Sequence, residues 1–159
     1  MNFEFARFHR CRPARPLLAF AVLALTGTLA VAAPASARHA ASCVAALKAR
    51  ETGLAVSINA GEPLQDEMLK VVRSGIAIIG TQYLAGLRES EARQMLDAAE
   101  KEFDALPAGE AEARQASCLQ EGDGLYRHAS PIERSLIGTA AKRRMDRVVR
   151  SVAAAQDHG

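Results

Sequence analysis

The segment 68–87, MLKVVRSGIAIIGTQYLAGL, constrains the fold most, because its last fourteen residues carry no charged side chain. Its apolar residues recur every three or four positions, which is the repeat of one helix face; they are Met68, Val72, Ile76, Ile79, Tyr83 and Leu87. Fourteen helical residues span about 21 Å, less than the roughly 30 Å of a bilayer core. The segment is therefore expected to be a helix that neighbouring helices bury.

The first 37 residues have the pattern of a secretory signal peptide. Four arginines precede a charge-free apolar run at 17–33, and the sequence PASA at 34–37 provides a small-residue cleavage site. Cleavage is expected after Ala37, which leaves residues 38–159 as a single domain in the periplasm or outside the cell. The alternative is a retained signal anchor, since seventeen residues are at the lower edge of membrane-spanning length.

Removal of this leader changes the charge balance. The whole sequence has 20 Lys and Arg against 18 Asp and Glu, and the first 37 residues contain four arginines and one glutamate. The remainder carries 16 basic and 17 acidic side chains, a net charge of −1. Because the basicity belongs to the leader and only Tyr83, Phe103 and Tyr126 are aromatic beyond it, nucleic acid is not an expected partner.

The cysteines indicate an oxidising compartment. Cys11 lies in the leader, which leaves Cys43 and Cys118 as an even pair. In an exported chain such a pair predicts one disulfide. The alternative is lipid attachment at Cys43, although the residue three positions ahead is alanine, where lipoproteins usually have a larger aliphatic residue.

Helical periodicity and turn signals predict four or five helices and no strand in the mature chain. The expected helices cover 42–58, 64–87, 91–106, 110–120 and 131–152. The last begins at a capping box, SPIE at 130–133. The predicted fold is an all-α, small four- or five-helix bundle after the signal peptide, with an up-and-down arrangement as the default.

Several glycines and one glutamate fall at positions where the expected helices are unusual. The sequence EGDG at 121–124 is expected to form an exposed turn. Gly75 and Gly80 either permit close approach of another helix or mark a break, and both alternatives remain open. Glu51 falls close to the apolar face of the first helix, where a charge is out of place.

No catalytic or metal-binding motif is recognisable. The motifs of serine hydrolases, zinc proteases, phosphate-binding loops and dinucleotide-binding folds are missing from the sequence. The two cysteines are far apart and His39, His128 and His158 are scattered, so neither a metal nor a cofactor is expected. An enzyme with an unrecognised site near His128 stays as an alternative.

Charge is uneven along the mature chain. Residues 89–123 contain ten acidic and three basic side chains, whereas residues 133–157 contain six basic and three acidic ones. The first interpretation is that the basic last helix packs beside the acidic third and fourth helices. The second is a binding stripe for an acidic envelope protein or an anionic envelope component; its residues are Lys142, Arg143, Arg144, Arg147 and Arg150.

Together these patterns predict a small exported helical protein of the bacterial cell envelope that acts by binding and not by catalysis. A periplasmic inhibitor or immunity-type protein, which blocks an envelope enzyme, is the alternative within the binding class. The mature chain is expected to have no transmembrane segment. Its oligomeric state does not follow from the sequence.

Overall fold

The computed structural model describes residues 35–156. This range contains five α-helices and no strand, which confirms the predicted small all-α bundle. The helices are α1 (Ala35–Asn59), α2 (Gln65–Leu84), α3 (Glu89–Asp104), α4 (Ala108–His128) and α5 (Pro131–Gln156). The predicted signal peptide lies outside the described residues except for its last three, since α1 begins two residues before the predicted cleavage site at Ala37. None of the five described helices is both long and apolar enough to cross a membrane.

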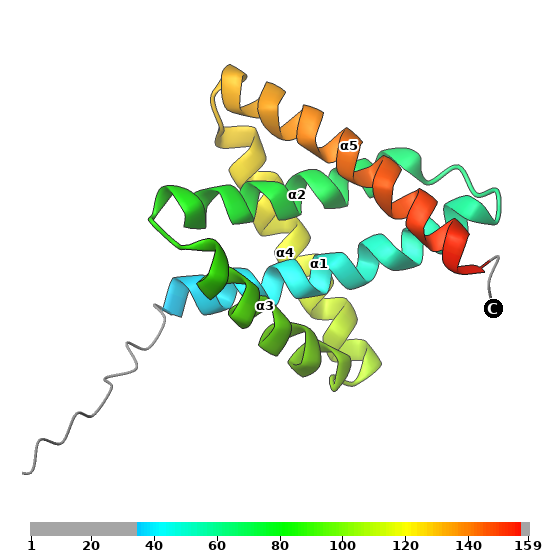
Figure 1. The fold of residues 1–159 in the computed structure, drawn as a ribbon, viewed down its shortest axis with the longest axis horizontal. Coiled ribbons are helices and arrows are strands. Elements are labelled where there is room, and N and C mark those ends of the chain that lie inside the picture. The colour runs from blue at the N-terminus through cyan, green and yellow to red at the C-terminus, as the bar shows by residue number, and fades with distance from the viewer. Residues whose placement is uncertain (1–34, 157–159) are drawn as a thin grey trace, which may run out of the picture. The chain divides into compact units, whose positions relative to one another are not determined.

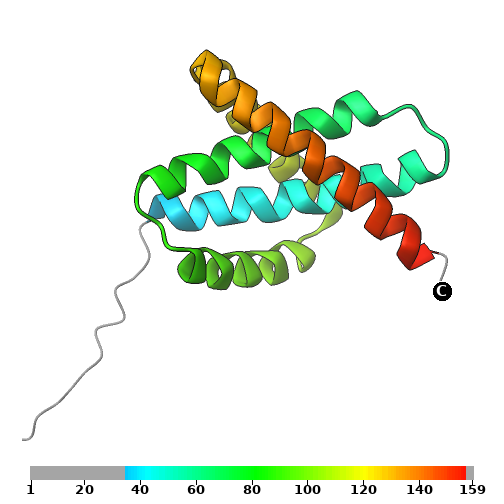
Figure 2. The same cartoon turned by 45° about the horizontal axis from the view of Figure 1, so that its top comes forward.

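The helices α1 and α2 form an antiparallel pair at the centre of the bundle (Figure 1). The helix α4 crosses one face of this pair and α5 crosses the other, while α3 packs along α1 (Figure 2). The bundle therefore departs from a simple up-and-down arrangement. Glycines in the left-handed region turn the chain after each central helix, with φ of 98° at Gly61 and 91° at Gly86.

Burial of α2 extends around most of the helix, because α1, α4 and α5 all pack on it. Its buried residues are Met68, Val71, Val72, Ser74, Ala77 and Ile78. Only Met68 and Val72 belong to the face that periodicity predicted. Tyr83 is 47% exposed, and Leu87 lies beyond the end of the helix. A single-face prediction fails here because a central helix has more than one buried face.

The helix α4 continues through the segment 121–124 that was predicted to be a turn. Gly122 is buried, and a Cβ built on it would lie 2.5 Å from the carbonyl oxygen of Ser74 in α2. This glycine therefore lets two helix backbones touch, and it does not serve a turn. Gly75 and Gly80 do not break α2, and a Cβ on Gly80 would meet no atom within 4 Å.

The helix α5 begins at the predicted capping box. The backbone amide of Ser130 donates to Glu133 Oε2 at 2.7 Å, and the amide of Glu133 donates to Ser130 Oγ at 3.3 Å. The expectation that α5 packs beside α3 and α4 is wrong, because α5 packs mainly on α1 and α2. Apolar residues decide this position, since buried Ala141 joins a core cluster with Ala55, Met68 and Val72.

Candidate functional site

Four of the five predicted stripe residues lie on the exposed side of α5. They are Lys142, Arg143, Arg147 and Arg150. None of the four forms an ion pair with a carboxylate among residues 35–156. The three arginines follow one another at helical spacing and line a shallow depression with Asp146. We call these four residues the basic stripe; with Asp146 their net charge is +3.

Arg144 points away from the basic stripe into the interface between α5 and α1. Its Nε donates a hydrogen bond to Glu51 Oε1 at 2.9 Å, and its Nη2 donates one to Oε2 at 2.9 Å. The Glu51 side chain is only 4% exposed. This pair explains the charge on the apolar face of α1, and it assigns Arg144 a structural role.

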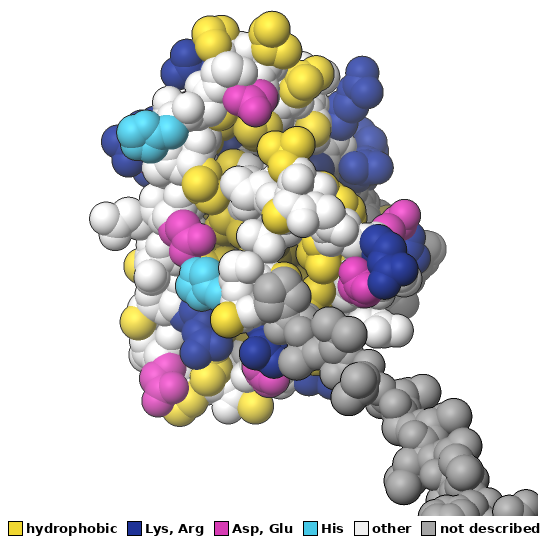
Figure 3. All heavy atoms as spheres, turned by 90° about the vertical axis from the view of Figure 1, so that its left-hand side faces the viewer, with side chains coloured by type: hydrophobic (Ala, Val, Ile, Leu, Met, Phe, Trp, Pro, Cys, Tyr) yellow, Lys and Arg dark blue, Asp and Glu magenta, His cyan; other side chains and the backbone are white. Residues whose placement is uncertain are grey.

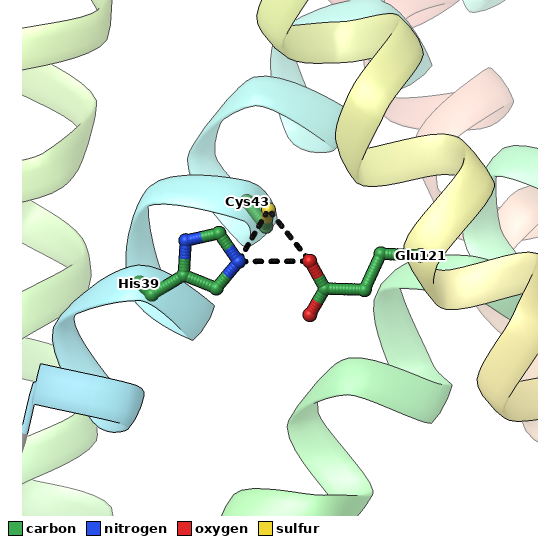
Figure 4. Close-up of side chains that lie close together, drawn as sticks. All are labelled: His39, Cys43 and Glu121. Atoms are coloured by element: carbon green, nitrogen blue, oxygen red, sulfur yellow. Dashed lines mark hydrogen bonds and ion pairs between the residues drawn. The ribbon is translucent and has the colours of Figure 1, made fainter.

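A second polar site surrounds the predicted cysteine pair. Cys43 of α1 and Cys118 of α4 are buried, and their sulfur atoms lie at disulfide distance, 2.03 Å. One turn away on each helix, His39 and Glu121 face the pair, with His39 Nε2 2.8 Å from Glu121 Oε2. The sulfur of Cys43 lies 3.8 Å from the same nitrogen and 4.0 Å from the same oxygen (Figure 4). We call these four residues the disulfide cluster.

The disulfide cluster does not have the geometry of a nucleophilic triad. In a triad the carboxylate and the nucleophile bind opposite nitrogens of the histidine. Here the carboxylate of Glu121 and the sulfur of Cys43 both face Nε2 of His39. The sulfur is also bonded to Cys118, so it is not a thiolate nucleophile in this state.

This cluster was not predicted, although the spacing of its residues is visible in the sequence. His39 precedes Cys43 by four residues, and Cys118 precedes Glu121 by three. Each spacing puts two side chains on the same face of a helix. The prediction that no metal is bound rested on the wide spacing of the two cysteines and of the histidines, and not on these close His–Cys and Cys–Glu pairs.

An apolar groove of about 170 Å³ lies between the start of α1, the end of α2 and the start of α3. Val44, Ile79, Tyr83 and Leu96 contribute to its walls. At its rim Glu89 and Arg93 form an ion pair. Figure 3 shows apolar side chains gathered on the end of the bundle that carries this groove. This groove was not predicted, because Tyr83 was expected to be buried and is instead 47% exposed.

His128 is exposed at the last residue of α4. Among the described residues no carboxylate forms an ion pair with it, and the nearby Asp123 pairs with Arg127 instead at 3.4 Å. The structure therefore brings no acidic partner to the one histidine that the enzyme alternative relies on.

The chain matches no protein-family model, no curated protein and no solved structure.

Proposed function

We propose that the protein is a small exported binding protein of the bacterial cell envelope that holds an acidic partner protein through the basic stripe. The observation that carries the proposal is the exposure of Arg143, Arg147 and Arg150 on one side of α5 without a carboxylate partner among the described residues. Export is inferred from the leader pattern and from the disulfide, which is stable in oxidising compartments.

The chemistry of the stripe suits a carboxylate-rich surface. A guanidinium group presents a planar set of donors that matches a carboxylate with two parallel hydrogen bonds. Three such groups on successive turns of one helix offer a row of these contacts. Asp146 lies beside them, so the partner surface must have either no acidic side chain or a basic one opposite this carboxylate. Complementary charge of this kind speeds association and selects among partners.

The stripe is also separated from the interactions that hold the fold. The fifth predicted residue, Arg144, is bound to buried Glu51, whereas the other four make no ion pair within the described part of the chain. Substitution of the stripe arginines therefore leaves the core contacts of α5 in place. This separation makes a clean test possible.

The test is co-purification of the tagged protein from its native envelope, with the wild type beside the triple variant R143E/R147E/R150E. The matched control is K70E/K101E/R134E, which reverses three exposed basic residues outside the stripe and changes the net charge equally. A partner that is retained by the wild type and the control but lost by the stripe variant supports the proposal. Retention of the same partner by the stripe variant, or its loss from both variants, rejects the stripe as the binding surface.

A further inference from the structure

We propose that reduction of the disulfide converts the disulfide cluster into a four-ligand zinc site. Three of the proposed ligand atoms, His39 Nε2, Cys43 Sγ and Glu121 Oε2, lie within 4.8 Å of one another. The fourth is Cys118 Sγ of α4, which is bonded to Cys43 in the disulfide and becomes available when that bond is reduced. The inference does not use the basic stripe, because no ligand lies on α5. It concerns the reduced chain, whereas the proposed exported form carries the disulfide.

The three atoms His39 Nε2, Cys43 Sγ and Glu121 Oε2 lie at separations that bracket those of a tetrahedral zinc site. With zinc bonds of about 2.0 to 2.3 Å, the ligand atoms of a tetrahedral site lie about 3.3 to 3.8 Å apart. The observed separations are 2.8 Å for nitrogen to oxygen, 3.8 Å for nitrogen to sulfur and 4.0 Å for sulfur to oxygen. Figure 4 shows the three side chains converging on one point. To reach the tetrahedral distances, the nitrogen and oxygen atoms must move apart and the sulfur and oxygen atoms must move closer together.

Helix spacing positions the ligands in two pairs. The residues four apart on α1 and three apart on α4 each share a helix face, as paired ligands do in helical metal sites. The two helices are held together by a core cluster that includes Ala40, Leu47 and both cysteines. The side chains of His39 and Glu121 are 61% and 41% exposed, which provides a path from solvent for the ion.

The oxidation state of the sulfurs decides whether the site exists. In the disulfide both sulfur atoms are bonded to each other, so only His39 and Glu121 remain as ligands. A dithiol reductant supplies two electrons and two protons, breaks the sulfur–sulfur bond to give two thiols, and itself becomes a disulfide. Zn²⁺ then displaces the two thiol protons into solvent and forms two zinc–sulfur bonds. For this the two sulfur atoms separate to about 3.8 Å.

The consequence is an exchange of one link between α1 and α4 for another. The disulfide joins the helices in an oxidising compartment, and zinc joins them at the same positions when the thiols are reduced. The chain thereby keeps α1 and α4 linked in both redox conditions.

The experiment uses the full-length chain with C11S, which removes the third thiol. The protein is reduced with a phosphine and titrated with Co²⁺ and then with Zn²⁺. We expect one Co²⁺ per chain with a sulfur-to-cobalt charge-transfer absorption and the visible bands of a tetrahedral ion, both lost when Zn²⁺ displaces it. The oxidised protein should show no charge-transfer band and bind Zn²⁺ at least a hundredfold more weakly.

The ligand variants are H39A and E121Q, and each should weaken zinc binding at least tenfold. The matched controls H128A and E112Q change the same residue types at exposed positions of α4 and should leave the affinity unchanged. No charge-transfer band in the reduced protein, equal affinity in the oxidised protein, or unchanged affinity in both ligand variants would overturn the proposal. If reduction lowers the helical circular dichroism, Zn²⁺ should restore it, and failure to do so also counts against the site.

Discussion

Arg144 of α5 donates hydrogen bonds to both carboxylate oxygens of Glu51 in α1, across 93 positions of sequence. The acceptor is almost fully buried, with a side chain 4% exposed, while Arg144 remains 37% exposed. A buried carboxylate needs such a partner, because removal from water is costly for an unpaired charge. The pair therefore joins α5 to α1 at one point, beside the apolar contacts of Ala141 that place α5 on the central helices.

Removal of the arginine should destabilise the protein more than removal of a neighbouring one. We expect R144M to lower the free energy of unfolding by roughly 3 kcal/mol, because it leaves Glu51 buried and unpaired. The control R143M changes an exposed residue of the same helix and should stay within about 0.5 kcal/mol of the wild type. Urea unfolding followed by circular dichroism measures both. Equal effects of the two variants would contradict a structural role for Arg144.

The contact of α4 with α2 predicts opposite effects of alanine at two nearby glycines. G122A puts a methyl group 2.5 Å from the Ser74 carbonyl oxygen, and we expect a loss of about 1 to 3 kcal/mol from overpacking. G124A meets no atom within 4 Å and should stabilise the protein by about 0.5 to 1 kcal/mol, since alanine favours the helix. Thermal unfolding compares the two. A stabilising G122A would show that the helices do not touch at this position.

The capping box should lower the pKa of the Glu133 side chain below that of a free glutamate. Hydrogen bonds from Ser130, through its side chain and its backbone amide, favour the ionised carboxylate and lower this pKa from its ordinary value of 4.5. The contribution to stability is therefore present above about pH 4.5 and is lost as the pH falls through the lowered pKa. Carboxyl chemical shifts followed by NMR during a pH titration measure it. The pKa in S130A should lie closer to 4.5, and an unchanged value would argue against the cap.

The disulfide should contribute substantially to stability. It connects residues 75 positions apart, and the chain-entropy model gives about 4 kcal/mol for a closed loop of this size. Reduction of the C11S protein with a phosphine, in the presence of a metal chelator, should lower the free energy of unfolding by roughly this amount. Urea unfolding of the oxidised and reduced forms checks the value. Coincident unfolding curves would mean that the core alone holds α1 against α4.

Local signals in the sequence were sufficient to predict much of the secondary structure. Ser130 and Glu133 indicated the start of α5, because a capping box requires only residues within one helical turn. The disulfide pairing was predictable as well, since Cys43 and Cys118 are the only two cysteines after residue 37. Glycines at 61 and 86 were near the predicted helix ends, where positive φ is needed.

Tertiary structure alone decided the features that depend on which helices cross. The sequence EGDG has the composition of a turn, yet α4 continues through it, and Gly122 lets its backbone touch Ser74 of α2. Arg144 and Arg143 are chemically identical side chains. Their roles differ because only Arg144 lies against the buried Glu51 of α1. His39 and Glu121 are 82 positions apart and meet because the disulfide brings one turn of α1 against one turn of α4. Helix formation depends on neighbours within a few residues, whereas the pairing of charges and ligands depends on contacts between distant segments, which helical periodicity does not encode.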